Sequence, residues 1–573
     1  MGRSGGGAVY TLRRIGWVYS LLVSAFVVVA GAVAQTIPPS VQPGAIERQL
    51  KSQPQTLPSG KIQIPAPEGL AAPSNATDIR VRLTAIDVVG AKALSSTELA
   101  PAYQGLIGRE ATIADLYAAA NAITAKYVAA GYAISFAIVP KQTIENGRAE
   151  IDVVEGYVAE FRFEGDTGDI PQVLTDYGKH IVSSRPLRTA ALERFLLLAN
   201  DVPGYTAKSV FDRIEGAPRG ATRLIIHLTH RFVSGSVTVD NRGSKAMGPW
   251  RADVGATLNN LLGQGEALNL RVFVSSDTNE LRYGSARISW PLGGNGTRVV
   301  MEGTYSDAHP GLALLSSIGF ASSGATARIG VEHPLIRSRA ENLQIDFFAA
   351  GQWLKSNLMA SPNSRDHIYT LSAGGTYWRY DDEGMATLAV HLSQGLDVFD
   401  ATTTSSLLRS RYAGSGAYTA LNLNASRIEE LGGGFEGVLS ASGQLASRAL
   451  LASQECGYGG GVFGRGFDDS EMVGDVCVLG STELRYNADV GNTLPLETLQ
   501  FYGFADTGFA DRRGTLLPGE RRNDMAYSAG LGLRWRFNEN LSGWVEYAQP
   551  LSRDVAQQGN RHGRIFVAIT GGF

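Results

Sequence analysis

Apolar and polar residues alternate with a period of two through most of residues 232–573, and glycines separate the alternating runs. Leu531, Leu533 and Trp535 share one face of such a run, while Arg534 and Arg536 lie on the other face. A period of two predicts β-strands with one apolar and one polar face. No sustained helical period interrupts this pattern, so the second half of the chain is expected to be all β.

The preceding residues combine short strand-like runs with runs of helical period. Two capping boxes, Ser95 with Glu98 and Thr112 with Asp115, predict helix starts. The expected order is β-α-α-β-β, with strands at 81–89, 132–140 and 148–155. This arrangement predicts a small α/β module over residues 79–155.

The same order recurs in residues 156–231. A weak helix is expected after Pro171 and a clearer one from Thr189, ending before Pro203 and Gly204. The expected strands of this second module are 158–164, 206–215 and 221–231. The chain is therefore interpreted as a tandem repeat of one module before the β region.

The N-terminal residues 1–34 have the pattern of a secretory signal peptide. Arg13 and Arg14 precede an apolar run at 15–30, and Ala32 to Ala34 form a small-residue cleavage site. An N-terminal membrane anchor is the alternative. Residues 35–78 are rich in proline and form an expected linker, in which 43–53 are either one short helix or unstructured.

Composition narrows the class of protein. Glycine makes up 68 of 573 residues, charged residues are 18%, and the apolar share is 44%, which excludes disorder for most of the chain. The net charge of −3 gives no electrostatic basis for nucleic-acid binding. Two cysteines are too few for a four-cysteine zinc site.

The β region is either a soluble sandwich or a membrane barrel. Export through a signal peptide, aromatic residues near strand ends and the final residue Phe573 favour a barrel. The aromatic residues expected in the membrane girdles are Trp290, Trp353, Tyr377, Trp378 and Tyr502. At about 21 residues per strand, 16 strands are expected. Residues 312–320 and 325–334 are either one bent strand or two.

Motifs for catalysis are weak. The glycine patterns starting at Gly432 and Gly459 match the dinucleotide fingerprint formally, but neither opens a helix in a βαβ unit. The sequence contains no P-loop, and its eight histidines are scattered. We therefore predict no enzyme activity, no catalytic residues, no cofactor and no metal.

The segment 459–475 is the most informative stretch. It is polar and glycine-rich, lies between two long strands, and holds one arginine, Arg465, between two glycines. Asp506 lies on the lumen face by alternation, where a lone carboxylate is costly unless it is paired. Arg465 either pairs with Asp506 or lies unpaired in a solvated loop. Cys456 and Cys477 flank this segment and are a candidate disulfide at its base.

These residues resemble the outer-membrane transporters of two-partner secretion, the TpsB or haemolysin secretion/activation (ShlB/FhaC/HecB) family. The run from Val462 to Phe467 resembles the VRG[YF] loop of that family, with Phe463 and Gly464 as an apparent insertion or change before the arginine. The corresponding loop residues are Gly464, Arg465, Gly466 and Phe467. The strand motif that anchors the loop in the family corresponds to Gly503, Asp506 and Gly508. Residues 131–132 and 153–156 resemble the first POTRA module, and 192–204 resemble the second.

The resemblance implies an α+β region of two POTRA modules in the periplasm and a 16-stranded barrel at 232–573 in the outer membrane of a Gram-negative bacterium. It implies export of one unfolded partner protein of adhesin or haemolysin type, captured by strand addition at a sheet edge. The edges expected to serve are the strands 132–140, 148–155 and 206–215. It further implies contact with outer-membrane lipid and the barrel assembly machinery, Phe573 as assembly signal, and an N-terminal plug helix. An assembly factor of the same superfamily is the alternative function.

Overall fold

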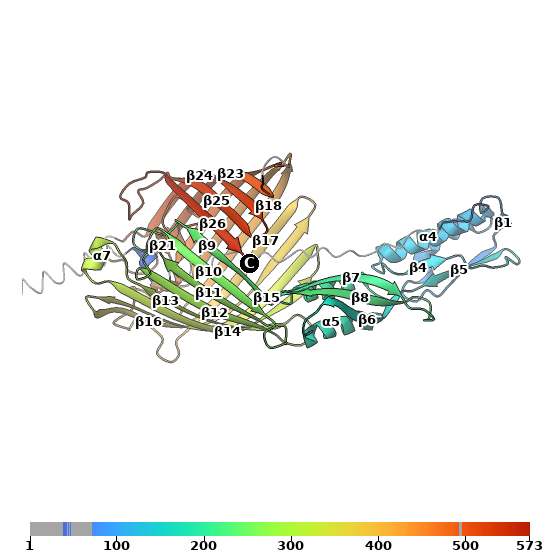
Figure 1. The fold of residues 1–573 in the computed structure, drawn as a ribbon, viewed down its shortest axis with the longest axis horizontal. Helices are drawn as coiled ribbons and strands as arrows, with labels where there is room; N and C mark the ends of the chain where they lie inside the picture. The colour runs from blue at the N-terminus through green and yellow to red at the C-terminus, as the bar shows by residue number, and fades with distance from the viewer. Residues whose placement is uncertain (1–37, 43, 45, 47–70, 492–494, 519) are drawn as a thin grey trace, which may run out of the picture.

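The computed structural model describes residues 38–42, 44, 46, 71–491, 495–518 and 520–573 (Figure 1). The predicted signal peptide lies outside the described residues. Of the candidate helix at 43–53, only Gly44 and Ile46 are described, and both are helical. Figure 1 shows two α/β modules in a row beside a large barrel.

The first module has a three-stranded sheet in the order β2-β5-β4 and a separate pair of β1 with β3. Both predicted capping boxes are present, at the starts of α3 and α4. The predicted strand 81–89 is two strands, because the chain changes its pairing partner between them: β1 pairs with β3 and β2 pairs with β5. The elements are β1 (Arg80–Arg82), β2 (Ala85–Val89), α3 (Ser96–Leu99), β3 (Glu110–Thr112), α4 (Ile113–Ala129), β4 (Phe136–Ile138) and β5 (Arg148–Val154).

One predicted edge in this module is wrong. The strand expected at 148–155 is β5, which lies in the centre of its sheet between β2 and β4. Since both of its sides are already hydrogen-bonded, β5 has no free edge for an added strand. The expected strand 132–140 is reduced to β4, which is an edge strand of three residues.

The second module has a sheet in the order β6-β8-β7, covered by two helices. The helix expected to be weak, α5, is twelve residues long, and α6 buries Leu192, Leu196 and Ala199 against the sheet. The edge strands are β6 and β7. The elements are β6 (Tyr157–Asp166), α5 (Gln172–Ser183), α6 (Thr189–Asn200), β7 (Tyr205–Arg213) and β8 (Ala221–His230).

Sixteen antiparallel strands close the barrel, as predicted. The last strand pairs with the first over five residue pairs, and the backbone of Phe573 exchanges two hydrogen bonds with Gly235 at this seam, each 3.0 Å. The strands are β9 (Val233–Asp240), β10 (Arg251–Asn259), β11 (Ala267–Ser275), β12 (Leu281–Pro291), β13 (Arg298–Ala308), β14 (Ala321–Arg337), β15 (Glu341–Leu358), β16 (Ser361–Asp381), β17 (Gly384–Leu396), β18 (Thr419–Gly432), β19 (Phe435–Ala446), β22 (Val476–Ala488), β23 (Thr498–Asp511), β24 (Asn523–Asn538), β25 (Leu541–Pro550) and β26 (Arg564–Gly572).

The ambiguous stretch 312–334 is one strand preceded by a loop. Residues 312–320 form that loop with a short helix, α7 (Ala313–Ser317), and the strand is β14. Leu315, Ile318 and Phe320 are buried together, so their apolar character reflects packing within the protein and not contact with lipid. The count of 16 follows from this single strand.

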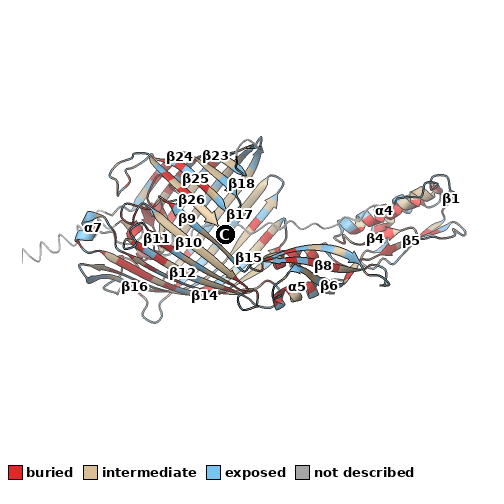
Figure 2. Ribbon diagram, in the orientation of Figure 1, coloured by how far each residue is buried: buried red, intermediate tan, exposed pale blue. Residues whose placement is uncertain are grey.

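The two faces of the barrel strands differ as the alternation predicts (Figure 2). On β15, Phe347 and Trp353 are exposed on the outer face, while Leu354 is buried. Two of the expected girdle residues are wrong, because Trp378 and Tyr502 are buried on the opposite, inward face. Aromatic identity alone does not distinguish a membrane-facing ring from one that packs inside the lumen.

The second module is fixed to the near rim of the barrel. The guanidinium of Arg337 binds both carboxylate oxygens of Asp201, each at 2.7 Å. Asn260 donates to the Asp169 carbonyl and to the Tyr205 hydroxyl, each at 2.9 Å. These contacts orient the module at the barrel opening. No helix among the described residues is long and apolar enough to span a membrane.

A short N-terminal segment lies at the other end of the barrel, which we call the distal end. The 3₁₀ turn η1 (Pro39–Val41) precedes Ile46, and Val41 and Ile46 are buried beside Met247. The Ser322 hydroxyl donates to the Val41 carbonyl at 2.9 Å. The described part of the N-terminal region therefore packs against the barrel, away from the α/β modules.

Candidate functional site

The loop between β19 and β22 folds back against the inner wall of the barrel. Its ends form a small hairpin, in which β20 (Cys456–Tyr458) pairs with β21 (Met472–Gly474). Cys456 and Cys477 form a disulfide that spans 21 positions of sequence and encloses the whole segment 459–475. The disulfide and the hairpin hold both ends of the loop that carries Arg465.

Arg465 binds Asp506 of β23 through three hydrogen bonds. Its Nη2 lies 2.9 Å from Oδ1, and its Nε lies 3.1 Å from Oδ2. The backbone N–H of Arg465 also donates to Oδ2, at 2.9 Å. Arg465 is 4% exposed and Asp506 3% exposed, so the pair is shielded from solvent. Two parallel bonds to one carboxylate give both strength and a fixed geometry.

The strand wall offers Arg465 further partners that the sequence analysis missed. Its Nη1 lies 2.6 Å from the Glu483 carboxylate, and the guanidinium stacks 3.5 Å from the centre of the Phe504 ring. Glu483 also binds Arg534 at 2.7 Å. The signal for these residues was present, because alternation puts Glu483 and Phe504 on the inward faces of β22 and β23. Only the closed barrel brings those faces to the loop.

Two glycines of the motifs make room for the loop. A Cβ at Gly508 would lie 2.3 Å from the Tyr458 ring, and a Cβ at Gly464, where φ is +82°, would lie 2.6 Å from the same ring. At Gly503 the nearest atom to an added Cβ is 3.8 Å away. Close approach therefore requires glycine at 464 and 508 but not at 503.

Apolar packing supports the ion pair. Phe467 is buried with Tyr458, Met472 and Val555, and its ring centre lies 5.9 Å from that of Tyr458. Gly466 lies so close to Ser528 that an added Cβ would be 2.9 Å from the serine Cβ. Residues 464–467 are therefore packed closely against the inner wall of the barrel.

Acidic residues beyond Arg465 bind the distal end of β26 and the loop that precedes it. Asp468 pairs with Arg564 at 2.7 Å, and the Glu471 carboxylate accepts a bond from the Ala556 N–H at 2.8 Å. Burial raises the pKa of Glu471 to about 7 and that of Asp469 to about 6. Burial therefore favours the protonated form of both carboxyl groups in the docked loop.

A cavity of about 1030 Å³ joins the second module to the barrel interior. Thr206 and Lys208 of the edge strand β7 line one side of it. Arg287, Arg298 and Glu332 of the barrel wall line the other. The cavity is polar at the barrel wall and opens beside a strand edge, which suits an extended polypeptide better than a small apolar ligand.

The contacts of Arg465 anchor the loop to the inner wall. Its guanidinium is held by the Asp506 and Glu483 carboxylates, by the Ser481 hydroxyl at 3.0 Å and by the Phe504 ring. Among the described ranges, no three His, Cys, Asp or Glu side chains gather in a way that could hold a metal ion. Breaking the contacts of Arg465 would free the loop without any covalent step.

A closed 16-stranded barrel, POTRA-like α/β modules and a loop bound to the inner wall together define the class of POTRA-containing outer-membrane barrels. Residues 220–535 match the family model of the haemolysin secretion/activation protein ShlB/FhaC/HecB, and residues 81–156 match the POTRA domain of ShlB type. The chain belongs to the ShlB/FhaC/HecB family. Transporters of this family export partner proteins and are not enzymes. The barrel lies in the outer membrane and the POTRA region in the periplasm.

Two curated relatives illustrate the extent of the similarity, one over nearly the whole chain and one over less than half of it. The haem/hemopexin transporter protein HuxB of Haemophilus influenzae strain 86-028NP is 25% identical over 553 residues, covering 94% of this chain and 96% of HuxB. The outer membrane transporter CdiB of Escherichia coli O6:K15:H31 is 27% identical over 262 residues, which is 44% of this chain and 43% of CdiB.

Solved structures show the same fold. CdiB from Escherichia coli superposes with a TM-score of 0.69 at 21% identity, covering 92% of this chain and 95% of that one. BamA from Haemophilus ducreyi lacking POTRA domains 1–3 gives 0.52 at 14% identity, covering 86% and 99%. The family match favours export of a partner over the alternative of an assembly factor.

Proposed function

We propose that the chain captures an unfolded exoprotein of adhesin or haemolysin type at the free edge of β7 and passes it into the barrel. The observation that carries this proposal is the cavity beside β7, because a strand added to that edge would lie at the lumen entrance. Main-chain pairing at a sheet edge binds an extended chain with little sequence preference. The positive charge of Lys208, on the same edge strand, favours acidic stretches of the cargo.

The division of the chain into functional parts follows from the sequence. Residues 1–34 serve as signal peptide, 35–78 as a linker with a plug segment, 79–155 and 156–231 as two POTRA modules, and 232–573 as the pore. The packing of Val41 and Ile46 inside the barrel end supports a plugging role for the N-terminal segment. Phe573 is the proposed signal to the barrel assembly machinery, and its pairing at the β9–β26 seam supports a role in closure.

We call the loop residues Gly464, Arg465, Gly466 and Phe467 the latch, because they are proposed to hold the loop against the inner wall of the resting pore. Asp506 and Gly508 are its receptor on β23, while the Cys456–Cys477 disulfide holds the base of the loop. Since the loop occupies the inner wall, transport requires it to shift or to be displaced. The buried pair keeps the loop in place until cargo enters.

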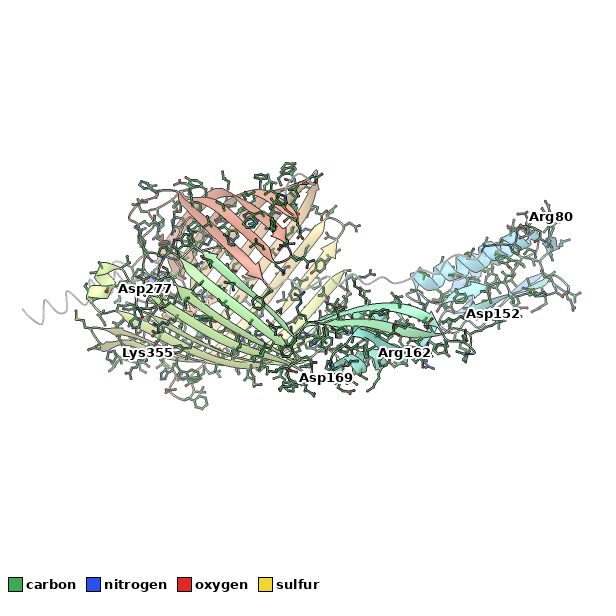
Figure 3. All side chains as sticks on the ribbon, viewed as in Figure 1. Arg80, Asp152, Arg162, Asp169, Asp277 and Lys355 are labelled. Carbon is green, nitrogen blue, oxygen red and sulfur yellow. A yellow bond between two sulfur atoms is a disulfide. The ribbon has the colours of Figure 1, made fainter. Side chains whose placement is uncertain are left out.

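Site-specific crosslinking tests the capture step. A photoreactive amino acid at position 208 on β7 is expected to crosslink to the secreted partner during export. The same probe at Arg162 on β6, the opposite edge of the same sheet, is the matched control, and Figure 3 labels this residue. Equal crosslinking at both positions, or crosslinking only at position 162, contradicts capture at β7.

A further inference from the structure

Two positive charges stand side by side on the outer face of the barrel. Lys355 of β15 and Arg365 of β16 are directly opposite in the strand register, and both side chains are exposed. Figure 3 labels Lys355 on the barrel, toward the distal end. Like charges opposite one another destabilise a sheet unless something neutralises them.

The depth of Lys355 and Arg365 in the membrane follows from the neighbouring outward residues of β15 and β16. Trp353 and His367, one step nearer the modules on the same outer face, are also opposite in the register. Outward residues of β15 that lie still nearer the modules, such as Phe347, are apolar. Trp353 itself is 41% exposed. The aromatic residues end the apolar band, so Lys355 and Arg365 lie at the depth of the outer-leaflet headgroups.

The two cations have no carboxylate partner within ion-pair distance in the described part of the chain. Asp400 lies near this region, but its carboxylate is bound by the Tyr369 hydroxyl at 2.7 Å and by the His367 ring. Asp307 is two strands from Lys355 along the register and contacts His309 at 3.5 Å. An anion from outside the chain is therefore needed to neutralise the pair.

An exposed aromatic residue, Phe399, lies beside Lys355 and Arg365. Phe399 is 91% exposed and has a φ of +56°, a conformation that is rare for a bulky residue and costs free energy. Its ring packs edge-on against Tyr369, which in turn packs edge-on against Trp353, with centroid distances of 5.2 and 6.2 Å. Phe399 therefore extends a row of aromatic rings that begins at Trp353 and presents an exposed apolar surface beside the two cations.

We propose that Lys355 and Arg365 bind a phosphate group of a phosphorylated lipid in the outer leaflet, with its acyl chains against Trp353, Tyr369 and Phe399. The Arg365 guanidinium suits a phosphate through paired hydrogen bonds, and Lys355 adds a point charge. The lipid neutralises the like-charge pair and fixes this sector of the barrel in the membrane. The inference uses the outer-membrane location only, so it stands or fails independently of how cargo is captured.

Binding of defined lipids to the full-length purified protein in detergent tests the proposal. The probes are bisphosphorylated lipid A, monophosphoryl lipid A and inorganic phosphate, compared by native mass spectrometry and by the thermal shift they cause. Replacing both cations, in Lys355→Gln with Arg365→Gln, is expected to weaken binding of bisphosphorylated lipid A roughly 30-fold. The matched control is Arg82→Gln with Lys141→Gln, which removes two exposed cations from the first module. Heat-modifiable migration in gels checks that each variant forms a folded barrel.

The outcomes distinguish binding of the whole lipid from binding of a phosphate group alone. Weaker binding in the Lys355/Arg365 variant, with the control unchanged and Phe399→Ser also weakened, supports the proposal. Equal binding by the double variant overturns it, and so does an equal loss in the control. If inorganic phosphate alone reproduces the shift and displaces the lipid, the patch is a free-phosphate site and the lipid assignment is wrong. If the double variant does not fold, Lys355→Gln alone decides by the same comparison.

Discussion

Arg465 binds the Asp506 carboxylate with its side chain and its backbone at once. One carboxylate therefore fixes both the direction of the arginine and the path of the loop backbone. Glu483 supplies the second negative charge on the other side of the guanidinium. The loop is held by a local network and not by general contact with the lumen.

Removing the arginine is expected to release the loop. Arg465→Ala leaves Asp506 buried without its main partner, and breaking a buried pair costs on the order of 3–5 kcal/mol. We expect secretion of the partner to fall at least several-fold while the barrel still assembles. Secretion assays with heat-modifiable gel migration measure both.

Arg521→Ala is the control, because Arg521 is an exposed loop residue outside the latch. It should secrete as the unmodified protein does. Normal secretion by Arg465→Ala would show that the latch has no role in transport.

Substitutions at the two motif glycines of β23 are expected to have different effects on the position of the loop. At Gly508 a methyl group would collide with the Tyr458 ring at 2.3 Å, so Gly508→Ala should displace the loop. At Gly503 the nearest atom to the added methyl group would be 3.8 Å away, an ordinary van der Waals contact, so Gly503→Ala should be silent. Protease accessibility of residues 459–475 reports on loop position, and equal accessibility in both variants contradicts the steric argument.

The disulfide is expected to stabilise the docked loop without holding the barrel together. A crosslink across a loop of about 15–25 residues is worth roughly 3 kcal/mol. Replacing Cys456 and Cys477 by serine should speed proteolysis at 459–475, while the melting of the barrel strands changes little. A collapse of barrel melting would instead assign the disulfide a global structural role.

Loop docking is expected to depend on pH. Burial raises the pKa of Glu471 from its ordinary value of 4.5 to about 7, with Asp468 raising it further and Arg553 and Arg564 opposing. Because the docked state favours the protonated carboxyl, docking is strongest below about pH 4.5. It weakens as the pH rises from about 4.5 through 7, by up to about 70-fold between pH 5 and 8.

Hydrogen exchange of residues 459–475 at these two pH values measures this effect. Glu471→Gln keeps the hydrogen-bonding shape but cannot ionise, so its exchange should depend less on pH once intrinsic chemical rates are subtracted. The same pH dependence in both proteins would mean that Glu471 is not the titrating group.

Much of the architecture was predictable because local periodicity reports on which face of an element is buried. The period of two in the β region predicted strands. Its length at about 21 residues per strand, with the even strand number of bacterial barrels, predicted 16 of them. Capping boxes at Ser95 and Thr112 marked two helices correctly. The errors occurred where position in the sheet decides. The strand 148–155 was expected at a sheet edge, yet it is central. Tyr502 was expected in the girdle for its aromatic ring, although alternation with Asp506 already places it on the lumen face, where it is buried.

The sequence by itself determined the order of modules and barrel, the inward face of β23, and the two residue types able to form the latch. Only the tertiary structure decided that Glu483 and Phe504 complete the site, that Gly508 and not Gly503 makes room for the loop, and that Lys355 meets Arg365. The reason is physical. Alternation along one strand fixes the face of each side chain, whereas strand register and the path of a long loop depend on contacts between residues far apart in the chain.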